Sequence, residues 1–358
     1  MQVLGLPSRA ALAVTLATAA AASAAPAAIA QAPDPTVKLR SAGDTRLTLS
    51  SRAAESLAQL GVRVAPLGSS SVRSGAVRFP ITGGAIDPAT AAGVIRHSGG
   101  IELAKGHTEV RLRNLRIRGR TLSAAVGGSR VRLMTLDLDR AKVTRPGAGG
   151  PLRSATRVRN VKVLLNRTGA RALNRAFHTT AFKGGLLLGR ATVTARPRQA
   201  LVEEGTTRLT LDAATAGTLT GALGLGLGVV APAAPQGDAI AFPITPSKIS
   251  TRLTSGTIRH TGGLSLDKAS TSLSLTDFDI RLGSSTLYAS VNGTSPKARI
   301  VSLDLSDART AARGRTLTIS GVKASLTGVA SDALTGTFDA PDTEGAPLGT
   351  VVVTANLR

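Results

Sequence analysis

Residues 110–120 read VRLRNLRIRGR, and residues 273–283 read LSLTDFDIRLG. In both stretches apolar residues recur at every second position, which is the spacing of a strand with one buried face. The alternation changes phase once in each stretch, at Asn114 and at Asp277. An extra residue at such a point predicts a β-bulge. The apolar positions agree between the two stretches, whereas the outward arginines of the first are mostly replaced in the second.

This likeness continues along the chain. The segment TRLTL at residues 45–49 returns 162 residues later, and GVIRHSGG at residues 93–100 returns as GTIRHTGG 163 residues later. Further matches keep the same order at spacings of 160 to 167 residues. Self-similarity at a nearly fixed spacing predicts two tandem copies of one module. We place them at residues 36–198 and 201–358.

Each copy has the pattern of an all-β fold. Alternating runs are bounded by Gly, Asp, Asn and Pro at spacings near ten residues, as in antiparallel β domains. After Ser50–Ser51, which can cap a helix, Ala53, Leu57 and Leu60 share one helical face. A second short helix is expected over residues 166–177 and in its counterpart in the second copy. We therefore predict two tandem β-sandwich-like domains with two short helices in each copy.

Residues 1–30 have the features of a secretory signal peptide. Arg9 precedes an alanine-rich apolar stretch that ends in the small-residue site Ala28-Ile29-Ala30. We expect cleavage near Ala30 and a mature chain that is secreted or associated with the cell surface. The stretch is too weakly apolar for a good spanning helix, and we expect no membrane-spanning segment in the mature chain. The sequence has no cysteine, which excludes disulfides and thiolate chemistry.

Positive charge is concentrated in the first copy. Residues 31–200 contain 30 Lys and Arg but only 8 Asp and Glu, whereas residues 201–358 contain 13 of each. Because the second copy lacks most of the outward arginines, the fold does not require them. They either form a solvated face or contact an anionic partner. The predicted anion-binding residues are Arg111, Arg113, Arg116, Arg118 and Arg120.

The expected partner is an anionic polymer or acidic protein surface of the cell envelope. Nucleic acid is disfavoured, because the basic strand has no interleaved aromatic residues that could stack on bases. The sequence contains no zinc-protease helix, nucleophile turn or phosphate-binding loop, so we predict neither an enzyme nor a metal site. His97 and His260 each precede a Gly-Gly turn in corresponding segments. Their recurrence favours a hydrogen bond that supports the turn over a catalytic role.

The order of the matched segments resembles the HtaA-type module of bacterial haem-uptake proteins. The first copy has the run from FPITGG through Asp87 to Gly106-His107, and the second has TLYASV at residues 286–291 followed by VSLDLSDA at residues 301–308. The resemblance covers nearly all of both copies. It implies an exported two-sheet β module with two short helices that works at the cell envelope.

In haem-binding members of that family, the resemblance implies a tyrosine ligand near the start of the module and a supporting histidine. A phenolate is a suitable ligand for ferric haem. His107 falls where the family has its histidine, but the helical segments of both copies lack tyrosine, and Tyr288 lies on a later strand. We therefore expect a non-catalytic envelope-binding or structural protein without a cofactor. Haem binding or relay through His107 is the alternative.

Overall fold

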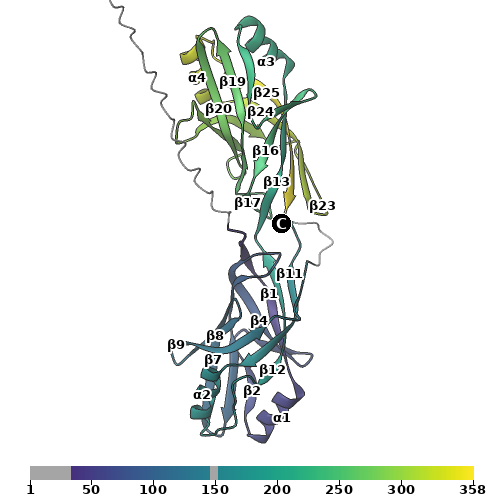
Figure 1. Ribbon diagram of the computed structural model, residues 1–358, viewed down its shortest axis with the longest axis vertical. Helices are drawn as coiled ribbons and strands as arrows, with labels where there is room; N and C mark the ends of the chain where they lie inside the picture. The colour runs from purple at the N-terminus through teal and green to yellow at the C-terminus, as the bar shows by residue number, and fades with distance from the viewer. Residues whose placement is uncertain (1–33, 146–151) are drawn as a thin grey trace, which may run out of the picture. The chain divides into compact units, whose positions relative to one another are not determined.

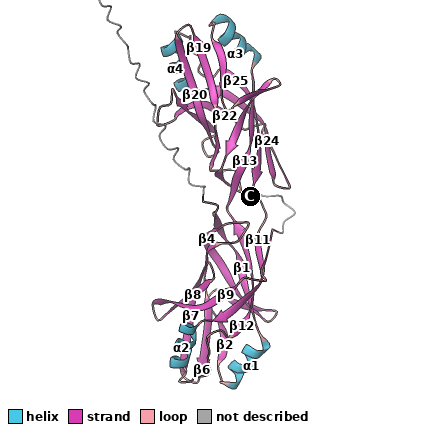
Figure 2. Ribbon diagram, viewed as in Figure 1, coloured by secondary structure: helices cyan, strands magenta, loops and turns pink. Residues whose placement is uncertain are grey.

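The structure is a computed structural model that describes residues 34–145 and 152–358. These residues form two β-rich domains with short helices, drawn in magenta and cyan in Figure 2. The predicted all-β fold is confirmed. The expected signal peptide, residues 1–30, lies outside the described residues. Within the described part of the chain, no helix is long and apolar enough to cross a membrane.

Eight strands of the first domain close into a ring in the order β7-β5-β4-β1-β12-β11-β9-β8, with β8 pairing back to β7. Their bounds are β1 Val37–Leu49, β4 Ala76–Ile86, β5 Gly93–His97, β7 Thr108–Arg118, β8 Thr121–Val126, β9 Ser129–Asp137, β11 Thr156–Leu165 and β12 Leu187–Pro197. β6 (Gly100–Lys105) also pairs with β7, β2 (Arg63–Leu67) with β6, β3 (Ser71–Arg73) with β4, and β10 (Lys142–Thr144) with β11. The predicted sandwich is thus one sheet that curves around its core and closes on itself.

The second domain has the same strand order, β20-β18-β16-β13-β25-β24-β22-β21, and β21 pairs back to β20. Its ring strands are β13 Gln199–Leu211, β16 Ala239–Thr245, β18 Thr257–His260, β20 Thr271–Arg281, β21 Thr286–Val291, β22 Ala298–Asp304, β24 Thr316–Leu326 and β25 Pro347–Leu357. The additional strands are β14 Gly226–Val230, β15 Ala234–Gln236, β17 Ser247–Ser250, β19 Gly263–Lys268 and β23 Arg309–Arg313. A common origin of the two domains stays a prediction from the sequence.

Short helices occur where the sequence predicts them. α1 (Ser51–Gln59) is capped by Ser50, and α2 (Arg167–Ala176) is capped by Asn166. Figure 1 shows both at the same end of the first sheet. In the second domain α3 (Ala213–Gly217) continues into one π-helical turn, η1 (Thr218–Ala222), and α4 (Gly328–Phe338) is capped by Thr327. In each cap a side-chain oxygen accepts a backbone N–H that the first helical turn leaves unpaired.

The predicted bulges in β7 and β20 are confirmed. Asn114 has φ of 50° and Asp277 has φ of 54°, and the strand register shifts at both residues. In β7 the residues before the bulge pair with β6 and those after it pair with β5. Leu112, Leu115 and Ile117 are all buried as a result. The bulge therefore keeps the apolar side chains inside and the arginines outside while β7 passes from one neighbour to the next.

The left-handed conformation of Asn114 makes a stability prediction. Asn114→Val is expected to destabilise the first domain by about 1–2 kcal/mol, because a β-branched residue fits positive φ poorly. Asn114→Gly should change the free energy of unfolding by less than about 0.5 kcal/mol, since glycine adopts this conformation readily. Urea denaturation followed by circular dichroism measures both. Equal effects of the two substitutions would contradict the role assigned to backbone conformation.

Candidate functional site

The arginines of β7 point to the outside of the first sheet. Arg113 and Arg118 are exposed and Arg116 is half-buried, while the alternate residues Leu115 and Ile117 fill the interior. The Nε of Arg116 is buried and has no hydrogen-bond partner among the described residues. This strand therefore presents cationic groups along one outer face, as its sequence predicts.

Strand pairing brings further arginines beside β7. Arg116 lies opposite Arg96 of β5 on one side and Ser123 of β8 on the other, and Ser123 lies opposite Arg132 of β9. Paired residues share a face of the sheet, and neighbouring strands are about 4.8 Å apart. In the next row, Arg113 and Arg130 both lie opposite Ala125. We call this surface the arginine face, and its members are Arg96, Arg113, Arg116, Arg118, Arg130 and Arg132.

The arginine face is not neutralised by carboxylates within the described part of the chain. None of its six members forms an ion pair with an Asp or Glu side chain of residues 34–145 or 152–358. The Arg130 guanidinium instead donates to the Asn114 carbonyl at 3.1 Å. Six like charges on one outer surface make a strong local positive potential.

Two of the five predicted residues differ from the others. Arg111 is paired with Glu102 at 2.8 Å and with Glu109 at 2.7 Å, and Arg120 is paired with Asp139 at 3.2 Å. The hydrogen bond to Glu102 and the nearby Glu109 charge raise the pKa of Arg111. Arg111 is therefore held by two carboxylates, whereas Arg120 has one exposed partner, and both add less to the field of the surface than an unpaired arginine does. Glu109 lies two residues from Arg111 on the same strand, whereas Glu102 and Asp139 come from other segments that alternation in the sequence does not place beside β7.

The second domain supplies a comparison for the central row. The row Arg96, Arg116, Ser123, Arg132 corresponds there to Arg259, Asp279, Tyr288, Arg299. Asp279 forms an ion pair with Lys297, with an N–O distance of 3.1 Å. The guanidinium of Arg281 lies 3.7 Å from the centre of the Tyr288 ring. Tyr288 therefore packs on the outer surface. This row of the second domain contains both positive and negative side chains, whereas the charged side chains in the corresponding row of the first domain are all positive.

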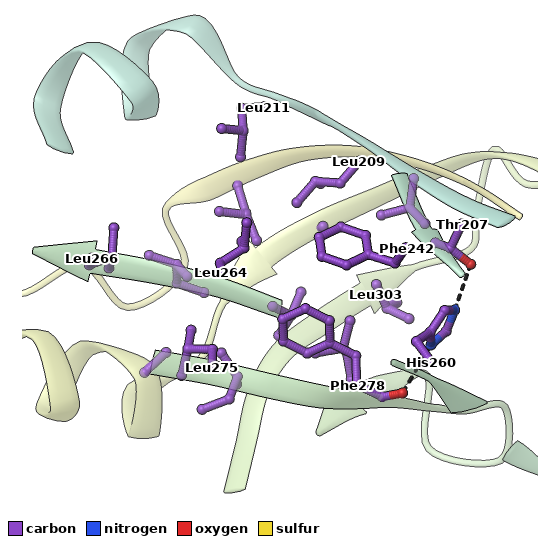
Figure 3. A pocket seen from close by; sticks show the side chains of 18 of the residues that line it. Thr207, Leu209, Leu211, Phe242, His260, Leu264, Leu266, Leu275, Phe278 and Leu303 are labelled. Atoms are coloured by element: carbon purple, nitrogen blue, oxygen red, sulfur yellow. Dashed lines mark hydrogen bonds between the residues drawn. The ribbon is translucent and has the colours of Figure 1, made fainter. Parts of the chain in front are cut away.

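His97 and His260 lie inside the sheets and not on the outer arginine face. His260 Nδ1–H donates to the Phe278 carbonyl at 2.9 Å, and the Thr207 hydroxyl donates to His260 Nε2 at 2.7 Å (Figure 3). His97 has the equivalent partners, Leu115 at 3.1 Å and Thr45 at 2.7 Å. Burial lowers the pKa of both histidines to about 4. Each neutral imidazole therefore links three strands through its two hydrogen bonds. The expectation that these histidines support the adjacent Gly-Gly turns by a hydrogen bond is wrong.

His107 occupies a different setting. It is exposed in the turn between β6 and β7, at the opposite end of β7 from Arg120. Among the described residues, no group of three or more His, Cys, Asp or Glu side chains could hold a metal ion. His107 is therefore an exposed imidazole outside any such group. Its role as a haem ligand stays a prediction.

The fold and surface define an all-β protein of two closed domains, the first of which carries a cationic outer face. No protein-family model matches the sequence, and no curated protein matches it. Among solved structures, the C-terminal domain of HtaA from Corynebacterium glutamicum is similar, with a TM-score of 0.37 and 14% identity over 44% of this chain and 99% of that one. The haem-binding protein HtaB from the same organism is similar with a TM-score of 0.30 and 12% identity, over 45% of this chain and 96% of that one.

Proposed function

We propose that this chain is an exported, non-catalytic protein that binds an anionic polymer of the cell envelope through the arginine face. The observation that supports this function is the six arginines without carboxylate partners among the described residues, on a surface where the second domain alternates its charges. Retaining unbalanced charge on a folded surface is unfavourable in itself, because like charges repel. An anionic partner removes that repulsion and gains ion pairs. Binding is then electrostatic and weakens as salt screens the contacts.

A direct test uses immobilised teichoic acid, a phosphodiester polymer, at about 0.15 M salt. The variant Arg96→Ser/Arg116→Asp/Arg132→Ser is expected to bind about tenfold more weakly or worse, equivalent to a loss of about 1.4 kcal/mol. The matched control Arg52→Ser/Arg73→Asp/Arg171→Ser removes the same charge from exposed positions of the same domain. It should retain most of the affinity. Equal losses in the two variants would show that only net charge matters, and undiminished binding of the first would remove the proposal.

Haem binding is the second candidate, and the exposed imidazole of His107 favours it. Titration with ferric haem should then produce a Soret shift that disappears in His107→Ala. A shift that survives in His107→Ala would assign any haem binding to other residues.

A further inference from the structure

The interior of the first domain contains a cavity of about 360 Å³. Most of its walls are apolar, and the side chains of Thr45 and His97 also line it; the apolar lining includes Phe79, Leu115, Ile117 and Met134. This volume lies within the range of about 300–1,000 Å³ that small-molecule sites occupy. Closed eight-stranded sheets have an interior wide enough for one small ligand when side chains do not fill it. Native interiors otherwise contain few voids larger than a water molecule.

The cavity reaches the surface at one end of the sheet. Its lining there comes from the β4–β5 connection, the β7–β8 turn and the segment after β9. Thr90, Ala92, Gly119 and Val143 line this end and are exposed. A ligand can therefore enter between these three segments.

At four positions around this space the second domain has a larger side chain, whereas its Val301 and Ala324 are smaller than Met134 and Val163 of the first domain. Phe278 replaces Leu115, since the carbonyl of each accepts a hydrogen bond from the buried histidine of its domain. The ring of Phe278 packs edge-on against Phe242, with ring centroids 5.1 Å apart. Val351 replaces Ala191, each lying opposite the corresponding leucine of the first ring strand. The second domain retains smaller cavities, including ones of about 100 and 90 Å³.

The entrance differs in the same direction. Leu253 replaces Ala91, and both have φ near 60°. Leu282 replaces Gly119, and the two make equivalent backbone hydrogen bonds to Gly256 and Gly93. Both leucines line the small cavity at this end of the second domain. All four positions are therefore smaller in the first domain, so its cavity is open where the second is plugged.

The open entrance also carries a cation. Arg120 lines the rim, and its side chain is 62% exposed and paired with Asp139, whose side chain is 70% exposed. The position after Leu282 in the second domain is Gly283, which carries no charge. An exposed pair of this kind contributes little to stability, so Arg120 can accept a second carboxylate at small cost. An apolar chamber with a guanidinium at its entrance is complementary to an amphiphile with an anionic head.

We propose that the first domain binds a fatty acid, with the acyl chain in the interior cavity and the carboxylate at Arg120. The mostly apolar lining favours an acyl chain over ordered water, because a buried water needs two or more polar partners. This ligand site lies inside the sheet and is independent of the polymer-binding proposal. The arginine-face variant must therefore leave fatty-acid binding unchanged, and failure of one proposal does not imply failure of the other.

Isothermal titration of the mature chain with dodecanoate tests the proposal, and about one molecule per chain is the expected result. Ala91→Leu/Leu115→Phe introduces the residues of the second domain and should weaken binding at least about tenfold. Ala191→Val alone is a milder version that should weaken it in the same direction. Phe278→Leu, the reverse change in the second domain, should leave dodecanoate binding as it is. A rise in the thermal transition of the first domain in Ala91→Leu/Leu115→Phe would show that the variant folds with its cavity filled.

Arg120→Ser separates the role of the head group from that of the chain. It should weaken dodecanoate binding about threefold to fivefold and leave dodecanol binding unchanged, because an exposed ion pair contributes up to about 1 kcal/mol. Absence of dodecanoate binding to the wild type, or equal binding to a folded Ala91→Leu/Leu115→Phe variant, overturns the proposal. Binding of ferric haem without binding of dodecanoate overturns it as well.

Discussion

Lowering the pH from 7.5 to 5 is expected to destabilise each β domain by about 2 kcal/mol. The cause is the buried histidine in each domain, whose pKa burial lowers from 6.5 to about 4. Between these values the unfolded chain binds a proton that the folded chain does not, so stability falls as the pH falls. The loss begins below pH 6.5 and is complete near pH 4. Chemical denaturation at both pH values, followed by circular dichroism, measures it.

The carboxylates act in a different range. Hydrogen bonds lower the pKa of Asp137, Asp267, Asp304 and Asp342 below the usual 3.8. Their contribution is present above that value and is lost only at more acidic pH. The free energy of unfolding at pH 5 therefore reports the protonation of the buried histidines and not that of these carboxylates.

The matched variant is His97→Gln/His260→Gln, whose amide can donate to the carbonyl and accept from the threonine without titrating. It should show little change in stability between pH 7.5 and pH 5. A wild-type loss that persists in this variant would point to general charge repulsion in the basic chain and would contradict the role assigned to the histidines.

Phe278→Ala is expected to destabilise the second domain by about 3–5 kcal/mol, the usual result of removing a buried aromatic side chain. Phe278 is buried and packs edge-on against Phe242 in the interior of the closed sheet (Figure 3). The chain has only six phenylalanines and no tryptophan, so aliphatic residues make up most of the core and cannot replace the lost ring. Calorimetry that follows the transition of the second domain measures the loss.

Tyr288→Ala is the control for this prediction, because it removes an aromatic ring from the outer face of the neighbouring strand. It breaks the contact with Arg281 but opens no cavity, so the loss should stay below about 1 kcal/mol. A small effect of Phe278→Ala, similar to that of Tyr288→Ala, would show that the interior of the second domain is less closely packed than the structure indicates.

The strands, the bulges and the helix caps follow from local sequence. The change of phase at Asn114 predicts the bulge because the buried faces on its two sides are read from neighbouring residues. Ser50 and Asn166 cap helices through contacts three residues away in the chain, and such contacts are visible in a sequence. The closure of each sheet was less accessible, because the pairing of β8 with β7 depends on curvature accumulated over all the strands.

The candidate site was only partly predictable for the same reason. Arg113, Arg116 and Arg118 stand out in the sequence because they alternate with apolar residues in one strand. Arg96 and Arg132 were not predicted as site residues, because only the register of β5, β8 and β9 places them beside that strand. Their outward positions in alternating strands were the available signal, but alternation does not reveal which strands are neighbours.

By itself, the sequence determined that this protein is an all-β chain with two similar halves and a cationic first half. The alternation of apolar and polar residues, helix capping and the number of charges depend on residues close together in the chain. They can therefore be recognised without a structure. Only the tertiary structure decided which charges are paired, as Arg111 is with Glu102 and Arg120 with Asp139. The tertiary structure also decided that the interior of the first domain has a large open cavity, whereas the cavities in the second domain are smaller. Both outcomes depend on contacts between residues far apart in sequence, whose distances arise only when the sheets close.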